Sequence, residues 1–495
     1  MTPRRRGAVL AAALVVLGGC RAAIDDQPRA AAPGPAALAA LPPLGPPVAA
    51  FALPPVAERV LPSGLTVLAV ESRALPLVSF VLVLPGGTAF DPPAAGGVAA
   101  LTAELLTKGT AARGAEELAL AIERLGGAIG AGAGADFATA TGEFLSKDLA
   151  AGLALFAEVV REPTFPPDEF RRARDLTLAG ILAAREDPAA IAGRCFDAYL
   201  FGAHPYGRPG SGTEPSLRGL VRDDVAEFYR RHYGPDGAVL AVVGDAPAAE
   251  LVASAERAFA GWRGGAGRQM LLPLPTRVTG RRLLLVDKPD AQQAHIVVGN
   301  VGIARTDPDY VPALVTGTIL GGGFGSRLLD ELRVRRSLTY GAWSGFVPGR
   351  VPGEFQAGTF TKVETTGEAL RVMLDVLGTF VAEGATAPEL DRAQQLRTGQ
   401  YPRQFETPGA LAGQLAGIHA HGLPRSDLAE HPARVLAVTL EDVRRMAATY
   451  AATDDAAIVV VGPAATVAAQ LAGIAPIDRT TPATCDLPGA PSAAR

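Results

Sequence analysis

The feature that most constrains the fold of this chain is an internal echo at an offset of 218 residues. The string Val-Arg-Asp-Asp-Val at residues 221–225 is matched by Thr-Leu-Glu-Asp-Val at 439–443, and Leu-Ala-Val-Val-Gly at 240–244 is matched by Ile-Val-Val-Val-Gly at 458–462. Each copy has the pattern of an amphipathic helix followed by a buried strand that ends on glycine. A period this long indicates a duplicated domain, because the repeats of solenoids are several times shorter.

The first half alternates short β-branched runs with longer Ala/Leu-rich stretches of helical spacing. Strands are predicted at residues 65–70 and 78–83. Helices are predicted at residues 96–107, 115–125, 149–161 and 167–185. This order predicts an α+β fold, in which strands pair into a sheet and helices cover one face of it.

The boundaries between domains follow from length and from Gly/Pro content. Residues 56–495, about 440 in number, exceed what one hydrophobic core usually supports, so at least two domains are expected. Residues 263–281 are rich in Gly and Pro and lack periodicity, which is typical of a linker. We therefore place the N-terminal domain at 56–262, the C-terminal domain at 282–480 and a tail at 481–495.

The first 20 residues have the layout of a bacterial lipoprotein signal peptide. Three arginines precede an apolar run that ends in Leu-Gly-Gly-Cys, with the cysteine at position 20. The run is shorter than the about 20 residues needed to span a bilayer, so we expect cleavage and lipidation of Cys20. The alternative is an ordinary signal peptide that contains a cysteine. The Ala/Pro-rich residues 21–55 are predicted to form a tether.

Export sets the expected location and the redox state. We expect a lipid-anchored protein of the bacterial cell envelope that faces the periplasm, and Arg21 in place of Asp favours the outer membrane. With Cys20 lipidated, Cys195 and Cys485 remain, far apart in sequence. A disulfide between them is possible, but a buried thiol is the preferred interpretation of Cys195. The net charge of −4, without Lys/Arg blocks outside the signal, argues against a nucleic-acid partner.

Several strings, in this order and spacing, resemble the insulinase-type (M16-like) zinc peptidase family over nearly the whole mature chain. They are Gly-Val-Ala at 97–99, Lys-Gly-Thr at 108–110, Glu-Asp-Pro at 186–188, His-Pro-Tyr-Gly-Arg-Pro at 204–209 and Leu-Gly-Gly-Gly-Phe-Gly-Ser-Arg-Leu at 320–328. The resemblance implies two homologous halves, each a mainly antiparallel sheet covered by helices, arranged as a clamshell. It points to a degenerate member, similar to the processing-peptidase and core-protein group.

The zinc motif of active family members, His-x-x-Glu-His, is absent here. Its two ligand positions fall on Ala100 and Glu104, and the position of the general base falls on Ala103. A further glutamate ligand on a later helix would fall on Gly180. A catalytic zinc needs about three protein ligands, and only Glu104 could serve. We therefore predict that this chain binds no metal and cuts no peptide alone.

The segment from Arg333 to Tyr340 resembles the family's Arg-x6-Tyr element, which reaches the substrate backbone and the developing oxyanion. A guanidinium and a phenol suit a peptide carbonyl that gains negative charge. The alternative is that Arg333 is a solvated helix residue and Tyr340 an aromatic at the start of a strand.

Three other motifs are not predicted to have a catalytic or ligand-binding role. The Gly-rich loop at 321–325 lacks the Lys-Ser/Thr of a P-loop, so we interpret it as a helix-entry loop. His419 and His421 point apart on a helix and are predicted to lie on the surface. His204 is predicted to order its loop.

The leading hypothesis is a non-catalytic, peptide-binding subunit of a two-chain M16-like peptidase. A partner subunit would hold the zinc and this chain would supply Arg333 and Tyr340. The alternative is a non-hydrolytic peptide-binding or scaffold lipoprotein of the envelope. A stand-alone peptidase with a rebuilt site would need a nucleophile or metal cluster that the sequence does not show.

Overall fold

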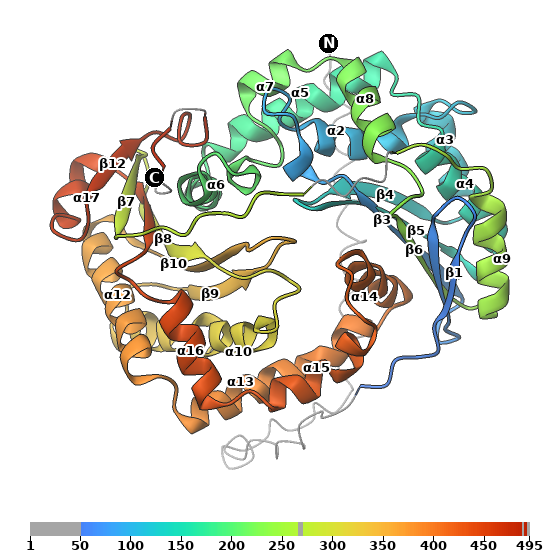
Figure 1. The fold of residues 1–495 in the computed structure, drawn as a ribbon. Helices are drawn as coiled ribbons and strands as arrows, with labels where there is room; N and C mark the ends of the chain where they lie inside the picture. The colour runs from blue at the N-terminus through green and yellow to red at the C-terminus, as the bar shows by residue number, and fades with distance from the viewer. Residues whose placement is uncertain (1–50, 266–270, 488–489, 493–495) are drawn as a thin grey trace, which may run out of the picture. The chain divides into compact units, whose positions relative to one another are not determined.

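Each half of the chain contributes one six-stranded sheet (Figure 1). The computed structural model describes residues 51–265, 271–487 and 490–492. The N-terminal sheet has the order β1-β2-β6-β3-β5-β4, with β1 (Ala57–Val60), β2 (Thr66–Glu71), β3 (Leu77–Pro85), β4 (Ala128–Ala133), β5 (Phe137–Leu145) and β6 (Val239–Gly244). The C-terminal sheet has the order β12-β7-β11-β8-β10-β9, with β7 (Arg282–Asp287), β8 (Gln293–Val301), β9 (Ala342–Val347), β10 (Glu354–Lys362), β11 (Ala457–Gly462) and β12 (Ile477–Thr480).

The two sheets repeat one plan. The pairs β2/β6 and β7/β11 are parallel, and the strands that follow them in each sheet pair antiparallel. Only the outer edge differs, since β1 joins β2 antiparallel whereas β12 joins β7 parallel. The predicted α+β fold of two homologous, mainly antiparallel halves is confirmed.

The helices of each half lie mostly on one face of its own sheet (Figure 1). In the N-terminal half these are α2 (Val98–Leu105), α3 (Ala115–Arg124), α4 (Leu149–Arg161), α5 (Pro167–Ala184), α7 (Glu214–Gly219), α8 (Arg222–His232) and α9 (Ala248–Ala258). In the C-terminal half they are α10 (Tyr310–Gly321), α11 (Arg327–Leu329), α12 (Thr366–Glu383), α13 (Ala387–Gln400), α15 (Ser426–Leu436), α16 (Leu440–Tyr450) and α17 (Ala464–Gln470). The helices predicted in the first half are confirmed within a few residues at each end.

The echoed strings have a local physical basis. Asp224 accepts a hydrogen bond from the main-chain N–H of Val221 (2.8 Å), and Asp442 accepts one from Thr439 (3.0 Å). Each aspartate thereby satisfies a free N–H at the start of its helix, α8 or α16. The two helices and the strands that follow them, β6 and β11, keep the offset of the sequence echo.

One helix from each half crosses to the sheet of the other half. Helix α6 (Pro188–Phe201) packs on β8 and β11, and α14 (Pro408–Ala420) packs on β3 and β6 (Figure 1). The central strands β6 and β11 are therefore buried along their whole length. Our expectation that helices cover one face was incomplete, because the second face is covered by a helix from the opposite half.

The structure corrects the interpretation of Cys195 as a thiol. Cys195 forms a disulfide with Cys485, with 5.3 Å between the Cα atoms and a sequence separation of 290. Because α6 lies against the C-terminal sheet, it meets the tail of the chain there. The Arg194 guanidinium also pairs with Asp486 at 2.7 Å, so the tail is held beside α6 by two kinds of bond.

The predicted linker has no regular structure over residues 271–281, but it is well anchored. Arg277 donates to the carbonyls of Val301 (2.6 Å) and Thr449 (2.7 Å), and the N–H of Val278 donates to Asn300 (2.9 Å). Cys20 and the signal peptide lie outside the described residues.

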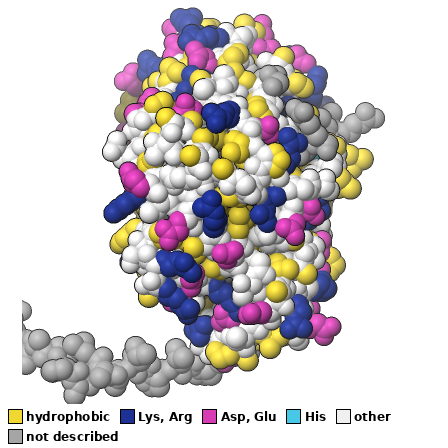
Figure 2. Space-filling view, turned by 90° about the vertical axis from the view of Figure 1, so that its left-hand side faces the viewer, with side chains coloured by type: hydrophobic (Ala, Val, Ile, Leu, Met, Phe, Trp, Pro, Cys, Tyr) yellow, Lys and Arg dark blue, Asp and Glu magenta, His cyan; other side chains and the backbone are white. Residues whose placement is uncertain are grey.

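The surface and the helices add two observations. Acidic and basic side chains are interspersed over the face shown in Figure 2. In the part of the chain that the structure describes, no helix combines the length and apolarity needed to cross a bilayer.

Candidate functional site

The four positions of the lost zinc motif lie on two helices that pack together, α2 and α5. Glu104 is exposed, Ala100 is half-buried and Ala103 is 1% exposed, so the three positions on α2 lie in different surroundings. Gly180 is exposed on α5, and a Cβ built there would meet nothing within 4 Å.

These residues do not fit a zinc ion. The two alanines have no donor atom, and Gly180 has no side chain, which leaves Glu104 as the only ligand type among the four positions. Among the described residues, no group of three His, Cys, Asp or Glu side chains is placed to hold a metal. A catalytic zinc site requires about three protein ligands, and this one falls short by two.

The scaffold around α2 is nevertheless intact. The buried Asp91 accepts hydrogen bonds from the N–H groups of Gly97 (2.6 Å) and Ala99 (3.0 Å) at the start of the helix. Burial raises the pKa of Asp91 to about 7, although these hydrogen bonds oppose the rise. Arg208 donates to the carbonyls of Asp91 (2.7 Å) and Ala89 (3.1 Å). The donors of the metal site are missing, while the turn that positions the helix is retained.

We expect the purified chain lacking residues 1–20 to hold no stoichiometric zinc and to cleave no unstructured peptide. The combined variant Ala100→His, Ala103→Glu, Glu104→His and Gly180→Glu should bind zinc measurably, because it returns three ligands to packed helices. Elemental analysis of dialysed protein measures the zinc content of the unmodified chain and of the variant. One tightly held zinc per unmodified chain, lost on Glu104→Ala, would contradict this expectation.

The second predicted pair, Arg333 and Tyr340, is brought together. The Arg333 guanidinium carbon lies 4.5 Å from the centroid of the Tyr340 ring, a cation–π contact. Arg333 belongs to a π-helical segment, η5 (Asp330–Arg335), and the chain then turns back through Ser337, whose φ is 55°. Both π-helical turns and left-handed non-glycine residues are uncommon, and they are enriched at functional sites.

The donor groups of this pair are free within the described part of the chain. The Arg333 guanidinium forms no hydrogen bond or ion pair there, whereas its neighbour Arg335 pairs with Asp330 (2.9 Å) and Arg336 pairs with Glu331 (2.7 Å). Tyr340 is 76% exposed, and its hydroxyl likewise has no partner among the described residues. The pair can therefore donate to an acceptor that approaches from outside the chain.

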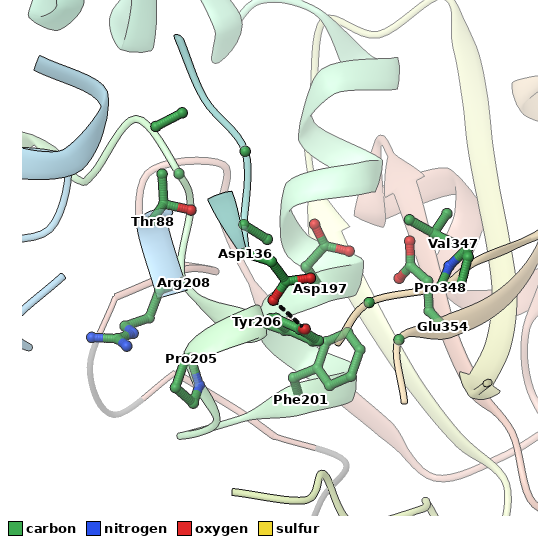
Figure 3. A pocket seen from close by; sticks show the side chains of 16 residues that line it. Thr88, Asp136, Asp197, Phe201, Pro205, Tyr206, Arg208, Val347, Pro348 and Glu354 are labelled. Atoms are coloured by element: carbon green, nitrogen blue, oxygen red, sulfur yellow. Dashed lines mark hydrogen bonds between the residues drawn. The ribbon is translucent and has the colours of Figure 1, made fainter. Parts of the chain in front are cut away.

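A cavity of about 310 Å³ lies between residues of the two halves, and no sequence motif predicts it (Figure 3). One wall is a hydrogen-bonded cluster: Tyr206 donates to Asp136 (2.6 Å), and the N–H of Arg350 donates to Asp136 (2.9 Å) and to the Tyr206 oxygen (3.1 Å). Burial and Asp136 raise the pKa of Tyr206. Asp197 on α6 and Glu354 on β10 form another wall.

The histidines are only partly as predicted. His204 orders its loop as expected, because its Nδ1 accepts from the N–H of Tyr206 (3.1 Å) and its Nε2 lies 2.9 Å from the carbonyl of Pro273. His419 and His421, predicted to lie on the surface, are half-buried. The His421 ring packs edge-on against Phe137 of the opposite half, and burial lowers its pKa.

Comparison with known proteins decides the family. A family model described as "Insulinase (Peptidase family M16)" matches residues 66–214, and one described as "Peptidase M16 inactive domain" matches residues 219–397. This chain belongs to the M16 peptidase family. An uncharacterized zinc protease of Mycobacterium bovis is 30% identical over 397 residues, which cover 79% of this chain and 89% of the relative.

Two further proteins are similar to this chain. The crystal structure of a peptidase M16 inactive domain from Pseudomonas fluorescens superposes with a TM-score of 0.78 at 31% identity, covering 83% of this chain and 98% of that one. A protein of Helicobacter pylori described as a non-peptidase homolog is 23% identical over 356 residues, covering 72% of this chain and 82% of the relative. The chain is a degenerate M16 member in which the zinc ligands of α2 and α5 are missing.

Proposed function

We propose that this chain is the non-catalytic, peptide-binding subunit of an M16 zinc peptidase complex in the bacterial cell envelope. A partner subunit of the same family holds the zinc, and this chain supplies Arg333 and Tyr340 to the bound peptide. The lipid on Cys20 anchors it to the membrane, with the folded halves facing the periplasm.

The observation that carries the proposal is the contrast between the two sites. Three of the four positions of the zinc motif have no donor side chain and the fourth holds only Glu104, while the side chains of Arg333 and Tyr340 are both present, adjacent and without other partners in the described chain. A guanidinium and a phenolic hydroxyl are suited to the oxygen of a peptide carbonyl that becomes negative during hydrolysis. Because the described residues hold no zinc ligand set, the proposal places the attack on that carbonyl at a site on another chain.

The disulfide supports the proposed location. Disulfides persist in oxidising compartments such as the periplasm and are rare in the cytosol. The bond between Cys195 and Cys485 joins segments far apart in sequence, and it is consistent with a protein that folds after export. The lipoprotein-like ending of the signal peptide at Cys20 points to the same compartment.

The test is reconstitution with a zinc-bearing M16 chain from the same genome, chosen for an intact His-x-x-Glu-His. We expect the two mature chains to form a complex that cleaves unstructured peptides, whereas each chain alone cleaves them weakly or not at all. Size-exclusion chromatography measures assembly and a quenched fluorescent peptide measures turnover. A complex that forms without gaining activity would favour a non-hydrolytic scaffold lipoprotein, and failure to assemble would overturn the proposal.

A further inference from the structure

The cavity between the halves contains two carboxyl groups that face each other from different halves. Asp197 comes from helix α6 and Glu354 from the start of strand β10 (Figure 3). Glu354 is only 8% exposed, and its Oε1 accepts a hydrogen bond from Gln356 (2.9 Å). Its Oε2 receives no donor from any described residue, and the group beside it is the second carboxyl. Two acceptors in contact need a proton or a cation between them.

The electrostatics of the cavity follow from this pairing. Burial is the main cause that raises the pKa values of both Asp197 and Glu354, and repulsion by Asp197 raises the pKa of Glu354 further. Near neutral pH the pair therefore holds one proton in common. Such a proton is readily displaced by a ligand that brings a positive charge.

The other charged groups that line the cavity are already engaged. Asp136 accepts from Tyr206 and from the main chain of Arg350. Arg208 donates to two main-chain carbonyls, and Figure 3 shows its guanidinium turned away from the carboxyl pair. Arg350 contacts this wall only through its main-chain N–H, and its side chain lies over the Phe137 ring, with 5.6 Å between the guanidinium carbon and the ring centroid. No cation of the described chain therefore neutralises Asp197 and Glu354.

The size and walls of the cavity indicate what kind of cation fits. About 310 Å³ is far more than a bare metal ion fills, and no three ligand side chains converge on one point in the described residues. The lining also includes the aromatic side chains of Phe201 and Tyr206 and the apolar side chain of Val347. A planar guanidinium can stack on such walls while its fork of N–H donors meets two carboxylates.

We propose that this cavity is a binding subsite for a single guanidinium group, the side chain of an arginine in a peptide ligand. The site lies wholly within this chain and draws Asp197 from one half and Glu354 from the other. This inference rests on the proposed function only in taking a peptide as the source of the arginine. When the guanidinium binds between Asp197 and Glu354, it replaces the proton that they share, and this proton is released to solvent.

Isothermal titration of the mature chain alone tests the proposal, so its failure leaves the assembly test unaffected. The probe is N-acetyl-arginine amide, and its control is the neutral isostere N-acetyl-citrulline amide. We expect the arginine probe to bind about tenfold or more tightly than the citrulline probe. The measured enthalpy should differ between phosphate and Tris buffers, because a proton is released. Affinity should rise with pH, by up to about tenfold per unit between the two pKa values, since proton release is favoured there.

Variants make the test specific. Glu354→Gln should weaken binding of the arginine probe about tenfold and abolish the buffer difference, because an amide can donate to Asp197 without a shared proton. This variant keeps the buried hydrogen bond, so it should remain folded by circular dichroism. Asp168→Asn, which removes an exposed carboxylate on α5, is the matched control and should bind as the unmodified chain does. Equal binding of the two probes, no binding of either, or an unchanged affinity in folded Glu354→Gln would overturn the proposal.

Discussion

The variant Arg333→Ala is expected to lower the turnover of the reconstituted complex about a hundredfold while leaving assembly unchanged. A donor that stabilises a developing oxyanion contributes on the order of 3 kcal/mol to the transition state. Tyr340→Phe, which removes only the hydroxyl, should lower turnover by a similar factor. The effect should fall on kcat, because the extra charge on the carbonyl exists only in the transition state.

The π-helical segment offers a matched control. Arg335→Ala removes the same charge from the same turn, but Arg335 is ion-paired with Asp330 and so is not free to donate. An exposed ion pair contributes about 1 kcal/mol or less to stability, so this variant should assemble and turn over normally. If Arg333→Ala and Tyr340→Phe both assemble and the complexes cleave at the unmodified rate, the pair does not act on the substrate, and the scaffold alternative becomes the better one.

The duplicated core could be predicted from the sequence because its signals are local. Helix α16 begins where Thr439 and Asp442 form a capping box, and that box is readable in four consecutive residues. The all-apolar runs of β6 and β11 indicate strands buried on both faces. In β6, Leu240 and Val242 join the core under the outer helices, while Val243 faces α14. The apolar run therefore indicates that a second layer is present.

The identity of that second layer could not be predicted. Helix α14 lies against β3 and β6 of the first half, although more than 160 residues separate it from β6 in sequence. A single sequence carries no local signal for which sheet an apolar helix covers. The same limit hid the disulfide, because Cys195 and Cys485 become neighbours only once α6 has crossed to the second sheet.

For the candidate site, the sequence predicts the missing zinc ligands but not the carboxyl pair. Missing ligands can be identified position by position, so Ala100, Ala103 and Gly180 argue against zinc from the sequence alone. The carboxyl pair could not be predicted, because Asp197 lies mid-helix and Glu354 opens a strand in the other half. Each has the sequence context of an ordinary surface acid, and only the packing of α6 on β8 and β11 brings them together.

Removal of the disulfide is expected to cause a large loss of stability. The double variant Cys195→Ala and Cys485→Ala should lower the free energy of unfolding by about 2–5 kcal/mol, because the bond closes a loop of 290 residues and so restricts the unfolded chain strongly. Chemical denaturation of protein exported to the periplasm measures this. A reductant should destabilise the unmodified chain to the same extent and should leave the double variant unaffected.

The part of the chain in which hydrogen exchange rises after removal of the disulfide tests whether the bond holds α6 on the sheet of the other half. Cys195 is buried where α6 packs on strands β8 and β11. From the tail, only Cys485 belongs to the same hydrophobic cluster among the described residues. If the disulfide holds the exchanged helix in place, its loss should increase hydrogen exchange along α6 and in the facing strand β11, as well as in the tail. The neighbouring carboxyl Asp197 lies on the same helix, so the arginine probe should then bind more weakly to the double variant. Exchange that rises only after residue 480, with stability otherwise unchanged, would mean that the bond fastens the tail alone and that packing by itself holds α6 on the second sheet.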